Sequence, residues 1–256
     1  MQTGHLNLKP SGGDLISESY LMDCMNGMRE YPDKYFDLAV VDPPYDFSIG
    51  NKNNFYVSQG KYNKVQKTRP KGGFKIGGNY MDSIQKPPSY EYFIELFRVS
   101  KNQIVWGGNY FTKYLPASTC WITWDKMNGE NYFGDCELAW TSFGSAIRKI
   151  NKVVHEKGRI HPTQKPVYLY DWIYLKYAEP GQKILDTHLG SGSNRIAAHK
   201  NGLHFVGFEI DKKYYYDQES RFKTYMSQPT LFSSLRAVGV LNSNALSLNF
   251  EQDIKL

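Results

Sequence analysis

The segment from Lys183 to Glu209 places the tightest limit on what this chain can fold into. A short apolar strand is followed by a Gly-Ser-Gly turn at residues 190–192, a helical stretch over residues 195–200 and a second apolar strand over residues 203–209. This order is typical of the first half of a nucleotide-binding βαβ unit, in which glycines let the backbone approach a ligand closely. The segment therefore predicts an α/β fold.

The residues around the turn narrow the choice of ligand. Glu209 ends the second strand about twenty residues after the turn, where a carboxylate would hold a ribose diol. NAD is an alternative ligand, but only two of the three glycines of its fingerprint are present, and Ser191 and Ser193 fill out the turn. An adenosyl group without a pyrophosphate fits this pattern better.

A second feature lies upstream, where the apolar run 36–41 ends in Asp42-Pro43-Pro44-Tyr45. The run has the length and β-branched ending of a buried strand, and open α/β sheets bind ligands at the carboxyl ends of their strands. Prolines remove backbone donors, so the segment offers a carboxylate and carbonyl acceptors beside an aromatic ring. Such a pocket suits a planar NH2 group, although a simple Pro-Pro turn after an edge strand is the alternative.

The run from Arg159 to Pro166 precedes an amphipathic stretch over residues 167–178. Thr163 is predicted to cap this helix and Pro166 to occupy its first turn. The run is then either a well-made helix start or a site for an anion, such as a carboxylate, at the positive end of the helix dipole.

Charge suggests an anionic partner. The chain has a net charge of +6 and a pI near 9.0, and residues 47–81 contain no Asp or Glu. We interpret this stretch as a basic loop that contacts a polyanion, with a solvated surface loop as the alternative; a second basic stretch follows residue 147. The residues assigned to nucleic acid are Lys52, Lys61, Lys64, Lys67, Arg69, Arg148, Lys149 and Lys152.

Taken in their order, these segments resemble the S-adenosylmethionine-dependent DNA amino-methyltransferases, in the group whose Asp-Pro-Pro-Tyr motif precedes the glycine loop. The resemblance is strongest to phage and prophage adenine-specific enzymes, and it covers most of residues 14–232. Other segments that carry it are Trp106 to Phe111, Trp124 to Lys126, Glu137 to Phe143 and His161 to Pro166. The chain departs from many relatives at Thr187-His188-Leu189, where those relatives carry a Pro-Phe type sequence.

The resemblance implies a Rossmann-like fold with a mixed, mostly parallel sheet flanked by helices, in a permuted motif order. It implies that Asp42, Pro43, Pro44 and Tyr45 bind the target amine, the N6 amino group of an adenine flipped out of double-stranded DNA. No metal is expected. The residues expected to bind the cofactor, S-adenosylmethionine, are His161, Thr163, Gln164, Lys165, Asp186, His188, Leu189, Gly190, Ser191, Gly192 and Glu209.

Several alternatives remain open at this stage. The acceptor could be cytosine N4, RNA or a protein amide, because the same pair of acceptors holds any planar NH2 group. A catalytically silent nucleic-acid-binding relative is a further alternative. A homodimer is one alternative for the assembly of the protein.

The expected organisation is one domain over residues 14–232, with the basic loop 47–81, a short target-recognition segment 125–160 and a tail 233–256. Strands 120–124 and 137–142 are predicted to form a hairpin at one sheet edge. Other predicted elements are helices at 90–99 and 217–225 and a strand at 103–106. Three unpaired cysteines and no membrane-spanning or signal segment indicate a cytoplasmic protein.

Overall fold

A computed structural model describes residues 15–45, 86–127, 135–152, 159–161 and 163–228. The basic loop 47–81, with Lys52, Lys61, Lys64, Lys67 and Arg69, and the tail 233–256 lie outside the described residues. The strands are β1 (Ser17–Leu21), β2 (Phe36–Val41), β3 (Ser100–Trp106), β4 (Trp121–Asp125), β5 (Cys136–Thr141), β6 (Arg148–Asn151), β7 (Lys183–Asp186) and β8 (His204–Glu209). The helices are α1 (Cys24–Arg29), α2 (Tyr90–Val99), α3 (Val167–Tyr177), α4 (Ser193–Lys200) and α5 (Lys212–Ser227), with a 3-10 turn, η2, at Gly108–Tyr110.

The described strands form one mixed sheet in the order β1-β8-β7-β2-β3-β5-β4-β6. The first five run parallel, β5 is antiparallel to β3 and to β4, and β6 is parallel to β4. The predicted hairpin of β4 and β5 is confirmed, but its position at the sheet edge was wrong because β6 pairs with the outer side of β4. The proposed recognition segment 125–160 thus contributes two strands to the main sheet.

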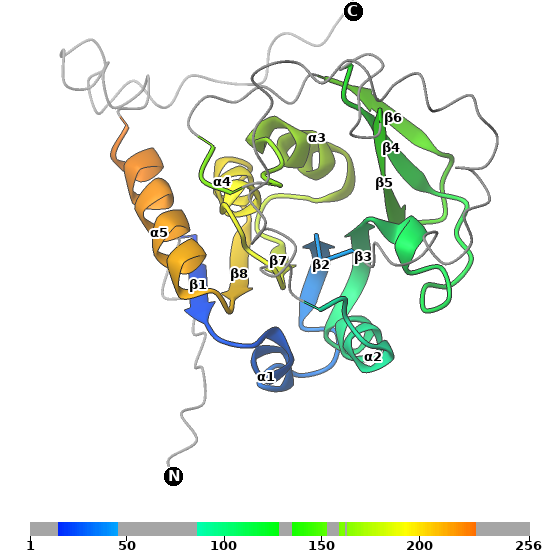
Figure 1. The fold of residues 1–256 in the computed structure, drawn as a ribbon, viewed down its shortest axis with the longest axis horizontal. Helices are drawn as coiled ribbons and strands as arrows, with labels where there is room; N and C mark the ends of the chain where they lie inside the picture. Colours follow the sequence, from blue (N-terminus) through cyan, green and yellow to red (C-terminus); the bar gives the residue numbers. More distant parts are fainter. Residues whose placement is uncertain (1–14, 46–85, 128–134, 153–158, 162, 229–256) are drawn as a thin grey trace, which may run out of the picture.

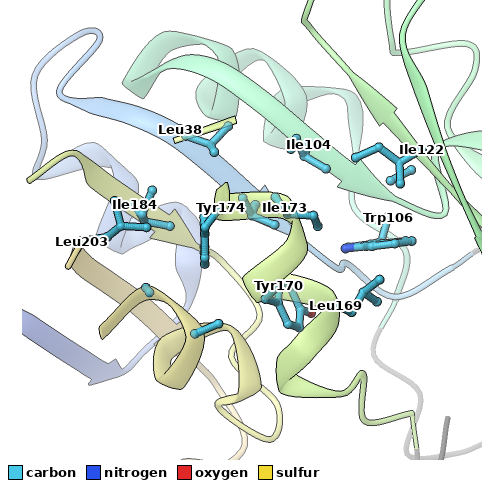
Figure 2. Packing of buried hydrophobic residues seen from close by; sticks show 14 of the residues in the cluster. Leu38, Ile104, Trp106, Ile122, Leu169, Tyr170, Ile173, Tyr174, Ile184 and Leu203 are labelled. Atoms are coloured by element: carbon cyan, nitrogen blue, oxygen red, sulfur yellow. The ribbon is translucent and has the colours of Figure 1, made fainter. Parts of the chain in front are cut away.

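Helices cover both faces of the sheet (Figure 1). On one face, α3 and α4 pack together over a core that includes Leu38, Trp106, Ile173 and Ile184 (Figure 2). On the other face, α1 and α2 enclose a second core around Phe36. This α/β arrangement with a mixed, mostly parallel sheet confirms the predicted fold class.

The central strand β2 shows why the sheet forms as it does. Its sequence Phe-Asp-Leu-Ala-Val-Val is buried at every position except Asp37, which is half-buried. Because β2 pairs with β3 on one side and β7 on the other, and both faces carry helices, a nearly continuous apolar run is what its position requires. Within the described residues, none of the helices has the length and apolar character needed to cross a membrane.

The start of α3 differs from the prediction. Pro166 is the N-cap residue rather than a first-turn residue, and the helix has no side-chain cap. Thr163 is exposed, and its backbone N–H and hydroxyl lie 3.3 and 3.1 Å from His161 Nδ1. Thr163 therefore braces His161 instead of capping the helix.

Candidate active site

The predicted ligand-binding segments meet at the carboxyl ends of three adjacent parallel strands. Asp42 follows β2, the glycine turn follows β7, and Glu209 ends β8. The chain leaves β7 toward β8 on one side, and leaves β2 toward β3 on the other. Such a topological switch point is where open α/β sheets bind ligands, because the loops diverge and leave a crevice there.

The side chains of Asp42 and Tyr45 form a hydrogen-bonded pair. The Tyr45 hydroxyl donates to Asp42 Oδ1 at 2.7 Å. Burial and the neighbouring Asp42 charge raise the pKa of the Tyr45 phenol well above its usual value, so Tyr45 stays a neutral donor. Pro43 between them is buried and Pro44 is half-buried, and neither can donate a backbone hydrogen bond.

The other carboxylate oxygen of Asp42 accepts a hydrogen bond from a buried lysine, Lys165. The ammonium of Lys165 lies 2.6 Å from Asp42 Oδ2, 3.1 Å from the Tyr45 hydroxyl and 3.0 Å from Glu137 Oε2. Lys165 is predicted from the sequence to be a cofactor residue, whereas the structure places its ammonium on the Asp42 side of the site. The sequence spacing could not show this, because 123 residues separate Lys165 from Asp42.

Gly107, the first of two consecutive glycines after β3, makes room for Tyr45. Gly107 has a φ of +66°, and a Cβ atom there would lie 2.2 Å from Tyr45 Cε1. Gly108 starts the η2 turn that carries Tyr110, whose ring stacks on that of Tyr45 at 5.1 Å and 12°. The glycines therefore permit an aromatic wall beside Asp42.

The glycine turn has the conformation that its sequence predicts. Gly190 and Gly192 have φ values of +49° and +71°, in the region that favours glycine. Glu209 supports the turn, because its Oε2 accepts the Gly190 N–H at 2.8 Å and its Oε1 accepts the Asp211 N–H at 2.9 Å. A carboxylate has about four acceptor positions, so Glu209 keeps capacity for a diol.

Asp186 links the turn to β2 through a residue that sequence analysis missed. Its Oδ1 accepts the His188 N–H at 3.0 Å, and its Oδ2 accepts Asn194 Nδ2 at 2.9 Å. Asn194 Nδ2 also donates to the Val40 carbonyl at 2.9 Å, just before Asp42. Burial raises the pKa of Asp186 to about 7. Asn194 thus ties together the ends of the two strands on which the site depends.

The remaining predicted cofactor residues divide into two groups. His161 faces the turn, since a Cβ atom on Gly190 would lie 3.8 Å from its ring, and burial lowers the His161 pKa to about 4. His188 is half-buried beside the turn. In contrast, Leu189 is buried against Gly207 in the core, and the Gln164 side chain accepts the Ile160 N–H at 3.0 Å. Leu189 and Gln164 thus shape the site through packing and loop structure.

Of the basic residues predicted to contact nucleic acid, the three that the structure describes lie along the β6 edge. Arg148 and Lys149 are exposed on β6, and Lys149 Nζ lies 3.0 Å from Asp125 Oδ2. Lys152 is exposed with its ammonium 4.2 Å from the centroid of the Tyr168 ring. Their contact with a nucleic-acid backbone stays a prediction. Among the described residues, no group of three or more His, Cys, Asp or Glu side chains could hold a metal ion.

Besides Asn194, three residues have contacts at the site that the sequence does not predict: Glu137, Tyr110 and Arg221. Arg221 on α5 donates to the Ser191 carbonyl and to Ser193 Oγ, both at 2.8 Å, and so holds the outside of the glycine turn. A charged residue in the otherwise apolar strand Cys136–Thr141 was a usable signal for Glu137. No sequence signal distinguishes Arg221 from the other cations of its helix.

Comparison with known proteins gives a family match over more than half of this chain. The sequence profile of a family described as DNA methylase matches residues 51–220. The Type II methyltransferase M2.DpnII of Streptococcus pneumoniae is 28% identical over 254 residues, which cover 79% of this chain and 91% of that protein.

Two solved structures share the fold. The M1.HpyAVI–SAM complex superposes with a TM-score of 0.52 at 16% identity, covering 80% of this chain and 98% of that one. The PvuII DNA methyltransferase, which is cytosine-N4-specific, superposes with a TM-score of 0.52 at 12% identity, covering 81% and 87%.

Proposed function

This chain belongs to the DNA methylase family, and from that premise we propose that it transfers a methyl group from S-adenosylmethionine to the N6 amino group of adenine in double-stranded DNA. The observation that carries the proposal is the position of Asp42, a carboxylate at the end of β2, beside the glycine turn at the end of the neighbouring strand β7. An amine acceptor and a nucleoside-binding turn therefore lie at one switch point. The Type II relative supports a role in restriction-modification, and the sequence resemblance supports a phage or prophage enzyme.

The residues at the glycine turn fit the proposed cofactor. Gly190 and Gly192 expose the backbone of the turn, and Glu209 supplies the acceptors that a ribose diol requires. His161 borders the same turn. When bound, S-adenosylmethionine supplies an electrophilic methyl group on a positively charged sulfur.

On the acceptor side, the Asp42 carboxylate and the Pro43 carbonyl accept hydrogen bonds from the two N–H groups of the target amine. An exocyclic amine is a weak nucleophile because its lone pair is delocalised into the ring, and these two hydrogen bonds favour a pyramidal nitrogen. The nitrogen then forms a bond to the methyl carbon while the carbon–sulfur bond breaks and its electron pair stays on sulfur. The proton leaves the methylated nitrogen afterwards, so Asp42 has to position the amine rather than act as a strong base.

The aromatic wall supports a flipped target base. A base inside a duplex cannot reach this pocket, so it has to leave the stack, at a cost of a few kcal/mol. The stacked rings of Tyr45 and Tyr110 beside Asp42 offer a surface that partly offsets this cost. The same acceptors also fit the N4 amino group of cytosine, and the identity of the methylated nucleoside distinguishes the two.

The decisive experiment uses labelled S-adenosylmethionine and mixed-sequence duplex DNA, which is then digested to nucleosides. We expect labelled N6-methyl-2′-deoxyadenosine from the wild type and none from Asp42→Ala. Asp37→Ala is the matched control, because Asp37 lies at the other end of β2 and pairs with Lys101 on the surface. Labelled cytosine would contradict adenine specificity, and cofactor binding without labelled DNA would contradict the choice of substrate.

We propose that Arg148 and Lys149 contact the DNA backbone from the β6 edge. Each phosphate contact contributes about 0.9 to the slope of log K against log salt concentration, so Arg148→Gln should lower that slope by roughly this amount. DNA affinity measured by fluorescence anisotropy over a salt series gives the slope. Lys101→Gln, at the amino-terminal end of β3, is the control. An unchanged slope for Arg148→Gln would show that Arg148 does not contact a DNA phosphate.

A further inference from the structure

The Lys165 ammonium is held by two carboxylates of the candidate active site. The Lys165 side chain is 5% exposed, and its Nζ lies 2.6 Å from Asp42 Oδ2 and 3.0 Å from Glu137 Oε2. Burial lowers the pKa of Lys165, but Asp42 and then Glu137 raise it by more, so the ammonium stays charged. A buried lysine is thus stabilised by Asp42, the carboxylate proposed to contact the substrate, and by Glu137, which lies behind it.

Glu137 is suited to hold this charge by itself. Burial raises the pKa of Glu137, but the neighbouring charges of Lys165 and Lys126 lower it by more, to about 2. Glu137 is therefore ionised. Its Oε1 lies 2.7 Å from Lys126 Nζ. Its buried Oε2 lies 3.0 Å from Lys165 Nζ and forms an ion pair with it, but among the described residues it has no further hydrogen-bond donor. An acceptor is therefore in place beside Lys165 and is not fully used.

Asp42, in contrast, has a hydrogen-bond partner on each of its two oxygens. Its Oδ1 accepts the Tyr45 hydroxyl and its Oδ2 accepts the Lys165 ammonium. The ammonium also lies 5.5 Å from the centroid of the Tyr45 ring and 5.2 Å from that of Trp106. Lys165 therefore presents N–H donors to Asp42 next to an aromatic wall, which is what the proposed target amine would do. The amine and Lys165 compete for the same carboxylate.

We propose that Lys165 is a positioning residue for the transfer step: it holds the Asp42 carboxylate in place in the free enzyme and moves onto Glu137 when the target amine hydrogen-bonds to Asp42. This inference rests on the proposed function. Asp42 is kept oriented before the substrate arrives, and its oxygen is released without leaving a buried cation unpaired. Removing either Lys165 or Glu137 would leave a buried charge without its partner.

The two substitutions have different expected effects. Lys165→Met removes the group that orients Asp42, so the single-turnover rate should fall by ~10–100-fold, while the Kd for S-adenosylmethionine stays within about threefold. Glu137→Gln leaves Lys165 with Asp42 alone, so the amine competes with it less well. For Glu137→Gln the KM for duplex DNA should rise by ~10-fold with kcat kept within about threefold.

The matched control is Lys101→Met. Lys101 Nζ lies 2.7 Å from Asp37, so this variant breaks a similar pair at the opposite end of β2, on the surface. Its kinetic constants should match those of the wild type. Thermal unfolding of all variants identifies any that do not fold, and Glu137→Gln, which preserves side-chain shape, keeps the test available if Lys165→Met does not fold.

Three results would overturn the inference: a wild-type rate for Lys165→Met, a rate loss in Lys165→Met that is matched by loss of cofactor binding, or an unchanged KM for Glu137→Gln. Failure of the proposed function is a separate result, since the wild-type protein would then transfer no methyl group to DNA. Methyl transfer that depends on Asp42 but not on Lys165 would overturn this inference alone.

Discussion

The residues that surround Asp42 come from distant parts of the chain. Its oxygens contact Tyr45 from its own motif and Lys165 from the loop before α3, and Lys165 reaches Glu137 on β5. Gly107 after β3 leaves the space that the Tyr45 ring occupies. At the residue scale, the geometry of the acceptor side therefore depends on how distant segments pack around Asp42 and Tyr45.

The Gly107→Ala substitution tests this packing. A Cβ atom at Gly107 would lie 2.2 Å from Tyr45, so we expect methyl transfer to fall by at least ~10-fold as Tyr45 is displaced. Gly181→Ala is the matched control, because Gly181 also has a positive φ, of +84°, but nothing lies within 4 Å of its added Cβ. Both variants should lose roughly 1–2 kcal/mol for the left-handed backbone, measured by urea unfolding. Equal activity in the two variants would rule out the Tyr45 clash.

His188 gives the protein a dependence on pH. Burial lowers its pKa to about 4 from the ordinary 6.5, an effect that Asp23 only partly opposes. The unfolded chain therefore takes up a proton below pH 6.5 while folded His188 stays neutral, so stability is complete above pH 6.5 and is lost as the pH falls toward 4. Between pH 7.5 and 5 this loss is on the order of 1–2 kcal/mol.

His188→Gln removes this titration. The free energy of unfolding of the variant should fall less than that of the wild type between pH 7.5 and pH 5, as measured by urea denaturation. The variant should accordingly lie closer to the wild type at pH 5 than at pH 7.5. A constant difference between the two proteins would show that His188 does not titrate as proposed.

At the scale of elements, the glycine turn is held from two sides. Asp186 and Asn194 fix its inner side to β2, and Arg221 on α5 fixes its outer side through Ser191 and Ser193. The helix that closes the domain therefore also supports the proposed cofactor site. This role follows from the packing of α5 beside β8 and α4, far from the turn in sequence.

Arg221→Met should accordingly weaken cofactor binding. Loss of the hydrogen bonds from a charged donor predicts a ~10-fold higher Kd for S-adenosylmethionine in calorimetry. Lys223→Met, an exposed cation on the same helix, is the matched control and should bind normally. A wild-type Kd for Arg221→Met would mean that the turn keeps its shape without this support.

At the scale of the whole molecule, both halves of the proposed site share one sheet. A ligand that binds the β7 and β8 side should therefore stabilise the protein as a unit. At a concentration of 100 times its Kd, S-adenosylmethionine should add about 2.7 kcal/mol to the free energy of unfolding.

The Asp42→Ala variant should show the same stabilisation, because Asp42 is proposed to serve the acceptor side. Thermal unfolding with and without the cofactor measures it in both proteins. Loss of the stabilisation only in Asp42→Ala would place Asp42 in the cofactor site.

Local sequence patterns predicted most elements of the fold. The apolar run of β2, the glycine turn and the helical segments over residues 90–99 and 167–178 depend on nearby residues, so their signals are local. The position of β6 outside β4 could not be predicted, because strand pairing depends on contacts between distant segments. Its basic sequence suggested a nucleic-acid contact, and that remains a prediction.

The sequence by itself determined the two segments proposed as the chemical halves of the site: an Asp-Pro-Pro-Tyr motif that would accept an amine, and a glycine turn, followed by Glu209, that would bind a nucleoside. Their residues act through backbone geometry and functional groups that neighbours in the chain define. Only the tertiary structure decided that Lys165 lies on Asp42, that Glu137 lies behind it and that Asn194 joins the two strands. Those contacts arise where strand order and helix packing bring together residues that are far apart in sequence.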